Sequence, residues 1–188
     1  MKKPALVFMA MLTIAATSAC DRQAEPPRPE QTSGSEASAL DRSHKGSQMP
    51  DLTTTGAVVS GAQAFRTAGL GPADIDVAQL YDSFTITVLL LLEDLGFCPK
   101  GEAAAFVRER DLTFRGDFPH NTSGGQLSVG QAGAAGGYLG LVEAMRQLCG
   151  MSGANQVKDA EVALVSGFGM INYDRGLASA AALLARAS

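Results

Sequence analysis

The sequence predicts an α/β domain in which helices cover a mixed β-sheet, preceded by a disordered N-terminal tail. From about residue 51, short apolar segments of strand length alternate with longer segments whose apolar residues recur every three or four positions. Before that point, residues 21–50 contain few large apolar side chains. The 188 residues, 46% of them hydrophobic, are enough for one core.

The first twenty residues have the order of parts found in a bacterial secretion signal. Lys2 and Lys3 precede an apolar run over residues 5–16, and small residues then lead to Cys20. The run is shorter than the ~20 apolar residues that a membrane-spanning helix needs. Residues 1–20 therefore resemble a signal peptide in which Cys20 would be lipidated, although Thr17 stands where that motif usually has Leu or Val. The alternative is a hydrophobic leader of another kind.

Residues 21–50 are rich in Pro, Ser, Gln and Glu, with only Leu40 and Met49 as sizeable apolar residues. Such a segment buries too little surface to offset its ordering entropy. We interpret it as a disordered linker, either a tether between an anchor and the domain or a tail without consequence. The folded domain is then expected over residues 51–188.

Charge and cysteine usage exclude several classes of function. The net charge of −4 gives no cationic field for a phosphate backbone, so nucleic acid is not an expected partner. The cysteines, at positions 20, 98 and 149, form no CxxC pair, and the only histidines are at positions 44 and 120. The sequence therefore predicts neither a metal site nor a disulfide framework.

The first half of the domain is predicted to contain three helices and a strand. Apolar residues at helical spacing predict a helix over residues 54–68 that stops at Gly69. Residues 76–80 read as a short strand that delivers Tyr81. Ser83 is then expected to cap a helix that runs to Gly96, apolar on every side and therefore buried. Residues 101–110 have helical composition.

The second half is predicted to contain a helix and two strands after a long irregular stretch. The helix ends near Gly150. Its apolar residues, at spacings of three and four, are Tyr138, Leu141, Val142, Met145, Leu148 and Cys149. Residues 161–165 form a short apolar strand, residues 167–174 read as a turn, and residues 176–185 are long enough for a buried strand.

Residues 121–137 are the most informative segment, because they contain six glycines and lead into a helix. Glycine permits close approach of the backbone and can aim free N–H groups at a ligand. The segment is neither a phosphate-binding P-loop nor a dinucleotide fingerprint. Taken alone, it is also compatible with tight packing of a loop against a helix.

The order and spacing of this segment resemble the C-terminal half of the thiolase superfamily, most closely its sterol-carrier-protein and lipid-transfer branch. That branch carries Asn-x-x-Gly-Gly-x-x-x-x-Gly-His-Pro-x-Gly-Ala-x-Gly. The matching positions here are Asn121, Gly124, Gly125, Gly130, Ala135 and Gly137. Residues 68–76 match the Ala-Gly-Leu-x-Pro-x-Asp-Ile-Asp motif of the family. Residues 81–84 stand where the branch has His-Asp-x-Phe or Asn-Glu-x-Phe.

The resemblance covers residues 49–188 and implies a thiolase-like C-terminal domain whose substrate is an acyl-CoA thioester. Coenzyme A would be part of the substrate, and no other cofactor is expected. Substrate-binding positions carried over from the motif are Asn121, Gly124, Gly125 and Gly130. The implied partners are a second thiolase-type subunit or a chain that supplies the N-terminal half.

Departures from the family pattern change the chemistry that the resemblance implies. Thiolases take their nucleophilic Cys from an N-terminal half for which this sequence shows no counterpart. The catalytic His of the family falls on Gln131, which can donate a hydrogen bond to an oxyanion but cannot act as a base. The second catalytic Cys falls near Met170. The usual Claisen chemistry is therefore not expected.

Phenols stand at the positions where the family places its acid and base groups. Tyr81 replaces the Asn or His of the branch, and Tyr173 lies beside the place of the lost Cys. Some lipid-transfer relatives are similar in this exchange and act as retro-aldolases on steroid side-chain thioesters, together with an OB-fold partner protein. The resemblance thus implies Tyr81, Gln131 and Tyr173 as catalytic residues, with a tyrosine as base and Gln131 as donor to the enolate.

Two classes of function remain open from the sequence. One is a partial thiolase-like enzyme, weak or inactive alone, in the cytoplasm where coenzyme A is found. The other is a non-catalytic binding or scaffolding remnant, exported and held at a membrane through Cys20. A genuine export signal and a coenzyme A-dependent activity contradict one another, and an artefact at the N-terminus would remove the conflict.

Overall fold

The computed structural model describes residues 8–9, 53–131, 133–172 and 175–186. The predicted leader and linker, Cys20 included, lie outside the described residues apart from Phe8–Met9. Tyr173 lies outside them as well.

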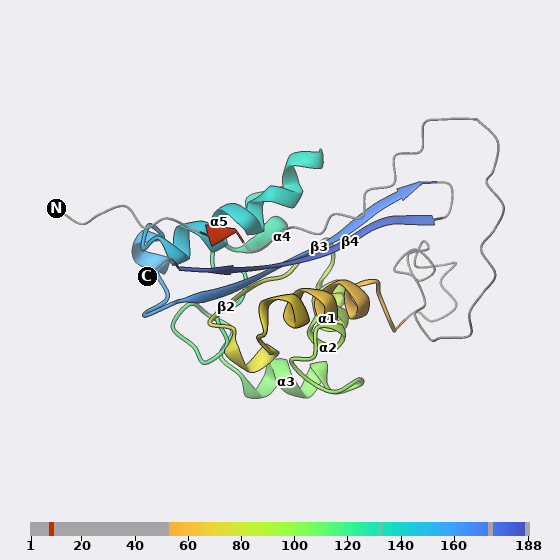
Figure 1. Cartoon of the computed structure of the whole chain (residues 1–188), viewed down its shortest axis with the longest axis horizontal. Coiled ribbons are helices and arrows are strands. Elements are labelled where there is room, and N and C mark those ends of the chain that lie inside the picture. Colours follow the sequence, from red (N-terminus) through yellow and green to blue (C-terminus); the bar gives the residue numbers. More distant parts are fainter. Residues whose placement is uncertain (1–7, 10–52, 132, 173–174, 187–188) are drawn as a thin grey trace.

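Helices and strands alternate along the described chain, as the sequence predicts (Figure 1). The elements are β1 (Phe8–Met9), α1 (Ala57–Ala68), β2 (Val77–Gln79), α2 (Thr85–Asp94), α3 (Ala103–Glu109), α4 (Gly125–Val129), α5 (Leu139–Leu148), β3 (Val162–Asn172) and β4 (Arg175–Ala185). Helix α1 ends at Gly69, which adopts the left-handed conformation with φ of 68°. This confirms the predicted stop.

The sheet is mixed, with the strand order β1-β4-β3-β2. Strand β2 pairs with β3 in parallel, and Val77 lies opposite Ala163. Strands β3 and β4 form a long antiparallel hairpin, and β1 pairs antiparallel with the end of β4. The predicted mixed sheet is therefore confirmed.

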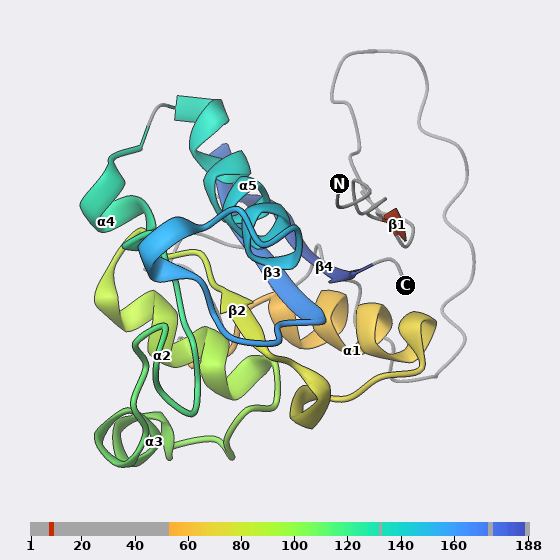
Figure 2. The same cartoon turned by 90° about the vertical axis from the view of Figure 1, so that its left-hand side faces the viewer.

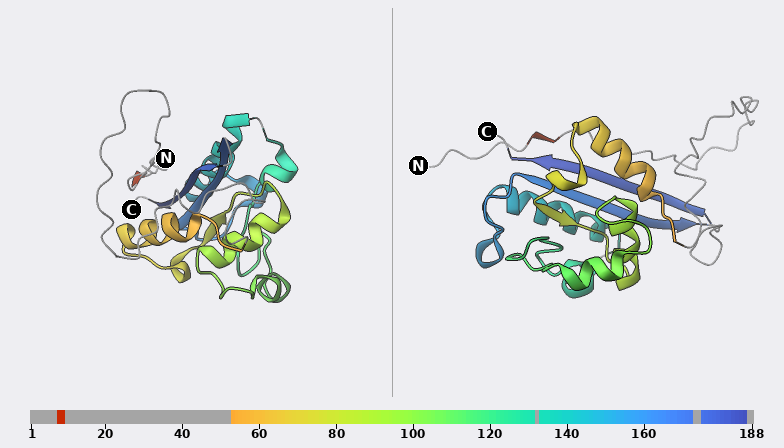
Figure 3. Two further views of the ribbon diagram at one scale, coloured as in Figure 1. Left: turned by 90° about the vertical axis from the view of Figure 1, so that its right-hand side faces the viewer. Right: turned by 90° about the horizontal axis from the view of Figure 1, so that it is seen from below.

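Helices cover both faces of this sheet. Helices α1, α2 and α3 lie on one side, and α4 and α5 lie on the other, as Figure 2 and the end-on view in Figure 3 show. The β3–β4 hairpin extends past the helices at one end (Figure 1). Successive side chains of a strand point to opposite faces. Thus Leu164 packs toward α1 and α2, whereas its neighbours Ala163 and Val165 pack toward α5.

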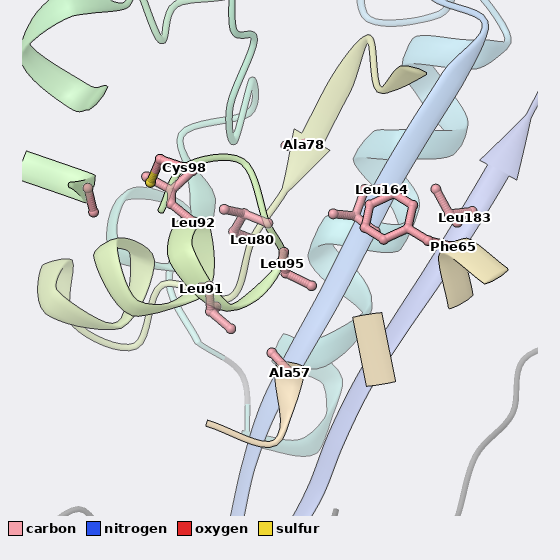
Figure 4. Packing of buried hydrophobic residues seen from close by; sticks show 11 residues of the cluster. Ala57, Phe65, Ala78, Leu80, Leu91, Leu92, Leu95, Cys98, Leu164 and Leu183 are labelled. Atoms are coloured by element: carbon pink, nitrogen blue, oxygen red, sulfur yellow. The ribbon is translucent and has the colours of Figure 1, made fainter. Parts of the chain in front are cut away.

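Two apolar clusters hold the layers together. The larger one joins Phe65 of α1 and Leu91 and Leu92 of α2 to the sheet residues Leu164 and Leu183 (Figure 4). The smaller cluster lies under α5 and includes Val77, Ala144, Leu148, Val157, Ala163 and Leu184. The two clusters fix β2 between the helical layers, and the end of β2 carries Tyr81.

The turn predicted over residues 167–174 is wrong, because β3 continues without a break to Asn172. Residues 166–169 pair in register with residues 178–181 of β4. The glycines in this segment suggested a turn. A neighbouring strand that satisfies their backbone groups makes them part of a ladder instead.

The prediction that the second helix is buried on every side is also wrong. Phe84, which immediately precedes the helix, and Ile86, in its first turn, are 69% and 57% exposed. The buried residues are Thr87, Leu91, Leu92 and Asp94, which recur at helical spacing. Ser83 does not cap this helix: its hydroxyl lies 3.2 Å from that of Thr87. None of the helices that the structure describes combines the length and apolar character needed to span a bilayer.

Helix α5 leaves several of its large apolar side chains exposed and buries two of its polar ones. Tyr138, which precedes it, is 65% exposed, and Val142 is 53% exposed. Glu143 and Gln147 are by contrast 3% and 1% exposed. The inner side of α5 is therefore held by polar contacts as well as by Ala144 and Leu148, and an apolar stripe faces outward.

Candidate active site

The segment that follows β2 is fixed by two side chains, those of Asn121 and Ser166. The Leu80 N–H donates to Oδ1 of Asn121 at 2.9 Å, and Nδ2 of Asn121 donates to the Leu80 carbonyl at 3.0 Å. The Tyr81 N–H donates to the hydroxyl of Ser166 on β3 at 3.2 Å. Both polar atoms of the Asn121 amide thus bind backbone, and they join the Gly-rich segment to the strand.

Asp82 holds the start of α4, which is the first turn of the Gly-rich segment. Its carboxylate accepts the Gln126 N–H at 2.8 Å and the Leu127 N–H at 3.2 Å. These are two of the N–H groups that a helix start leaves without an intrahelical partner. Asp82 therefore orients the loop.

Glycine is required where this loop passes Asp82. Gly124 and Gly125 have φ of 100° and 66°, in the region that side chains disfavour. A Cβ at Gly125 would lie 2.1 Å from Oδ2 of Asp82. These two glycines therefore allow the loop to fold over the carboxylate. Gly130, with φ of 103°, follows the last residue of α4, and a Cβ placed there would meet nothing within 4 Å.

The loop returns the side chain of Gln131 to Tyr81. Nε2 of Gln131 donates a hydrogen bond to the Tyr81 hydroxyl at 3.1 Å, in an exposed position. A Cβ at Gly136 would lie 2.8 Å from Cγ of Gln131, and one at Gly169 would lie 3.8 Å from the Tyr81 hydroxyl. Glycine on both sides leaves the phenol and the amide accessible.

A small pocket has Tyr81 in its wall. Its walls come from the end of β2, the Gly-rich segment, the start of α5 and Ser166 of β3. A second, wider groove lined by Ser123, Val129, Val142 and Arg146 shares the residues Ser123 and Leu139 with the pocket. A ligand at Tyr81 could therefore extend along α5.

Tyr81 and Gln131 together offer hydrogen-bond chemistry at one point. The phenol accepts a hydrogen bond from the amide, which leaves the O–H of Tyr81 to donate to a substrate atom. The amide Nε2 has a second hydrogen for a neighbouring oxygen. The described residues contain no cluster of three or more His, Cys, Asp or Glu side chains of the kind that holds a metal ion.

His120 lies next to Asn121 but does not take part in this pair. Burial lowers the pKa of its imidazole to about 4, against the weaker, opposing effect of the Asp82 carboxylate. Its Nε2 is buried and has no hydrogen-bond partner within the described part of the chain. The side chain is therefore a neutral, packed group near neutral pH.

The structure brings together most of the residues that the sequence singles out. Tyr81, Asn121, Gly124, Gly125 and Gln131 lie around the same loop and strand end. Tyr173 and Cys20, for which the sequence predicts catalysis and lipidation, belong to the parts of the chain that the structure does not describe.

Sequence reasoning missed three contributors to this site. Ser166 and Gly169 lie on β3, in a stretch that reads as an apolar strand followed by a turn. Thr122, within the Gly-rich segment, is 7% exposed and hydrogen-bonded to side chains from β2 and α5. A signal for Thr122 was present, since polar residues at positions 143 and 147 interrupt the apolar pattern of α5.

The sequence matches the thiolase C-terminal domain-like family over residues 37–178. Sterol carrier protein 2 of Rattus norvegicus is 40% identical over 108 residues, which are 57% of this chain and 20% of that protein. The 17-hydroxy-3-oxo-4-pregnene-20-carboxyl-CoA lyase of Mycobacterium tuberculosis is 45% identical over 106 residues, which are 56% of this chain and 26% of that protein.

A solved structure described as an Ltp2-ChsH2(DUF35) aldolase has the same fold. The two structures superpose with a TM-score of 0.62 at 36% sequence identity. The matched region covers 74% of this chain and 34% of the aldolase chain. This chain thus spans between a fifth and about a third of the length of these relatives. Because the family match extends over most of the sequence, the chain belongs to the thiolase C-terminal domain-like family.

Proposed function

We propose that this chain supplies the C-terminal part of an active site that cleaves a carbon–carbon bond in a β-hydroxyacyl-CoA by a retro-aldol reaction. The observation that carries the proposal is the hydrogen bond from Gln131 to the hydroxyl of Tyr81, a residue that also lines the small pocket. The names of the lyase from Mycobacterium tuberculosis and of a steroid side-chain-cleaving aldolase from Thermomonospora curvata, which is 45% identical over 106 residues, support this class of reaction.

A retro-aldol step needs a base for the β-hydroxyl proton and donors for the enolate oxygen. As the proton leaves, the bond between the α and β carbons breaks, its electrons pass to the thioester, and a ketone is released. Return of that proton from the base to the enolate carbon then gives the shorter acyl-CoA. We assign the proton transfer to Tyr81, which would accept the β-hydroxyl proton as the phenolate and return it as the phenol, and the donation to the enolate oxygen to the second N–H of Gln131. Tyr173 is proposed as a second acid or base.

The Gly-rich segment would carry the thioester. Gly124, Gly125 and Gly130 adopt positive φ, and Gly125 brings the backbone close to Asp82. Asn121 holds Leu80, so its contribution to substrate binding is made by placing the strand end and the loop. Coenzyme A enters as part of the substrate, and the domain needs no resident cofactor for this chemistry.

The site is proposed to be completed by another polypeptide. Large apolar side chains on α4, on α5 and immediately before and shortly after α5 are exposed, and Val129 and Val142 among them line the wider groove. They are Leu127, Val129, Tyr138, Val142, Met145 and Met151. Exposed apolar patches of this kind mark protein interfaces. Either a thiolase-type second subunit or a chain that supplies the N-terminal half would cover them, and the double name of the structural neighbour supports an additional partner, proposed to be an OB-fold protein.

The location of this activity follows from its substrate. Coenzyme A thioesters are cytosolic, so we propose that the domain works in the cytoplasm. Labelling cells with a radioactive fatty acid tests the alternative of an exported lipoprotein. Label on the wild-type chain that disappears in Cys20→Ala would establish the anchor and remove the cytoplasmic assignment.

The function is tested by product analysis with a branched β-hydroxyacyl-CoA. The chain is assayed alone and mixed with the separately produced N-terminal part of the Thermomonospora curvata aldolase. We expect little product from the chain alone, and a ketone and a shorter acyl-CoA in equal amounts from the mixture. Absence of both products under both conditions would refute the proposed reaction and leave a binding role.

A further inference from the structure

A buried polar network lies behind the candidate site, and the proposed reaction does not use it. At its centre is the Thr122 hydroxyl, which donates to Oε1 of Glu143 at 2.7 Å. The same hydroxyl accepts Nε2 of Gln79 at 3.1 Å and Nε2 of Gln147 at 3.0 Å. All four residues are more than nine-tenths buried. One hydroxyl thus joins β2, the Gly-rich segment and α5.

The Glu143 carboxylate is the anchor of this network. Its Oε1 also accepts Nε2 of Gln147 at 2.9 Å and the Ser152 hydroxyl at 3.4 Å. Its Oε2 faces the Arg146 guanidinium at 3.3 Å, and this arginine is half exposed. A buried carboxylate is costly unless it is fully hydrogen-bonded. Here the bonds that satisfy it set the position of Thr122.

Gln147 closes the network on its far side. Its Oε1 accepts the Val157 N–H at 2.8 Å, and its Nε2 donates to the Asn155 carbonyl at 2.8 Å. Nδ2 of Asn155 in turn donates to the Thr122 carbonyl at 3.2 Å. The side chain and the main chain of Thr122 are therefore both held from the α5 side.

The residues that Thr122 fixes are those that place Tyr81. Gln79 is the last residue of β2 and lies two positions before Tyr81. Asn121, the neighbour of Thr122, holds both backbone groups of Leu80. A shift of Thr122 would move both supports of the strand end together. The polar inner side of α5 thus has a direct route to the Tyr81 side chain.

We propose that Glu143, acting through Thr122, is a positioning residue that holds Tyr81 within hydrogen-bond distance of Gln131. The inference rests on the proposed function only for the catalytic consequence, since the positioning itself is a property of the folded chain. Buried, fully satisfied polar networks specify a single arrangement of the groups around them.

The test compares substitutions that keep or remove one contact. Thr122→Val keeps the shape of the side chain and removes the hydroxyl, whereas Thr122→Ser keeps the hydroxyl. Glu143→Gln removes the charge at constant shape. Glu161→Gln is the matched control, because Glu161 is 71% exposed and pairs only with Arg186 among the described residues. Circular dichroism and thermal unfolding identify the conditions under which each variant is folded.

The readout is the ¹⁹F spectrum of the full chain labelled with 3-fluorotyrosine. The chain has three tyrosines, so Tyr81→Phe assigns the signal of interest and the exposed Tyr138 provides an internal reference. We expect Thr122→Val and Glu143→Gln to shift the Tyr81 signal, with Thr122→Ser and Glu161→Gln close to wild type. In the mixture with the N-terminal part of the Thermomonospora curvata aldolase, Thr122→Val and Glu143→Gln should lower kcat by roughly tenfold or more, with little change in KM.

An unmoved Tyr81 signal in folded Thr122→Val and Glu143→Gln would overturn the inference, even if both variants melt at lower temperature. A shifted signal in a mixture that shows no cleavage would instead support the positioning and refute the proposed reaction. The spectrum and the product assay therefore fail independently.

Discussion

Gln131 donates a hydrogen bond from its side-chain amide to the hydroxyl of Tyr81 at 3.1 Å, across fifty positions of the sequence. Two elements make this contact possible. Strand β2 ends two residues before Tyr81, and the Gly-rich segment turns back over Asp82 to present Gln131. The contact joins two of the three residues to which the sequence assigns catalysis.

The turn over Asp82 depends on its carboxylate. Asp82→Ala removes the acceptor of the Gln126 and Leu127 N–H groups, and loss of such a helix cap typically costs about 1 kcal/mol. We expect this loss in the free energy of unfolding from urea titration, together with faster hydrogen exchange at these two amides. Asp82→Asn keeps one acceptor oxygen, so its unfolding free energy and amide exchange rates should lie between those of Asp82→Ala and the wild type. Unchanged exchange in Asp82→Ala would show that the carboxylate does not hold the loop.

Glycine at position 125 is required by geometry, and a second glycine of the same segment provides the control. Gly125→Ala places a methyl group 2.1 Å from the Asp82 carboxylate at a φ of 66°, whereas a Cβ at Gly137 meets nothing within 4 Å. We expect Gly125→Ala to destabilise the domain by about 1–3 kcal/mol and Gly137→Ala to change stability by less than ~0.5 kcal/mol. Equal melting temperatures for the two variants would contradict this description of the loop.

The outward stripe on α5 should control association. Val142 is 53% exposed, so Val142→Asp should leave the unfolding free energy of the domain within ~0.5 kcal/mol of wild type. The same change places a charge in the apolar patch and should lower the mass of the purified chain measured by light scattering. Ala144, two residues further along α5, is fully buried and provides the contrast. Ala144→Asp would bury an unpaired charge and should prevent folding. An unchanged mass for Val142→Asp would show that the stripe is not an interface.

Stability should fall in mild acid because of His120. Its pKa is about 4 in the folded chain and near 6.5 when unfolded, so the unfolded state binds the proton more tightly. The stability held above pH 6.5 is therefore lost as the pH falls toward 4, by about 3 kcal/mol at roughly 1.4 kcal/mol per pKa unit. His120→Leu should flatten this part of the profile of unfolding free energy against pH. Superimposable slopes for the two proteins would exclude His120 as the cause.

Local sequence signals predicted much of the fold. Gly69 marked the end of α1, and apolar residues over positions 76–80 marked the strand that delivers Tyr81. The motif over residues 121–137 identified the loop correctly, because Gly124 and Gly125 both adopt positive φ and a Cβ would lie too close to Ser128 at the first position and to Asp82 at the second.

The remaining features depend on contacts distant in sequence. The extension of β3 to Asn172 becomes visible only when β4 pairs with it, since glycine and small residues suit both a turn and a tight ladder. The buried side of α5 was hidden because Glu143 and Gln147 are polar. Their burial is favourable only with the partners that Thr122 and its neighbours provide.

The central claim is that the Tyr81 hydroxyl takes part in carbon–carbon bond cleavage. Its most direct test is the initial rate of ketone release from a branched β-hydroxyacyl-CoA by the reconstituted site, compared between wild type, Tyr81→Phe and the control Tyr138→Phe. Loss of a catalytic acid or base typically lowers the rate by about 10²- to 10⁴-fold, and we predict a loss of this size for Tyr81→Phe and none for Tyr138→Phe. Equal rates for wild type and Tyr81→Phe would contradict the account.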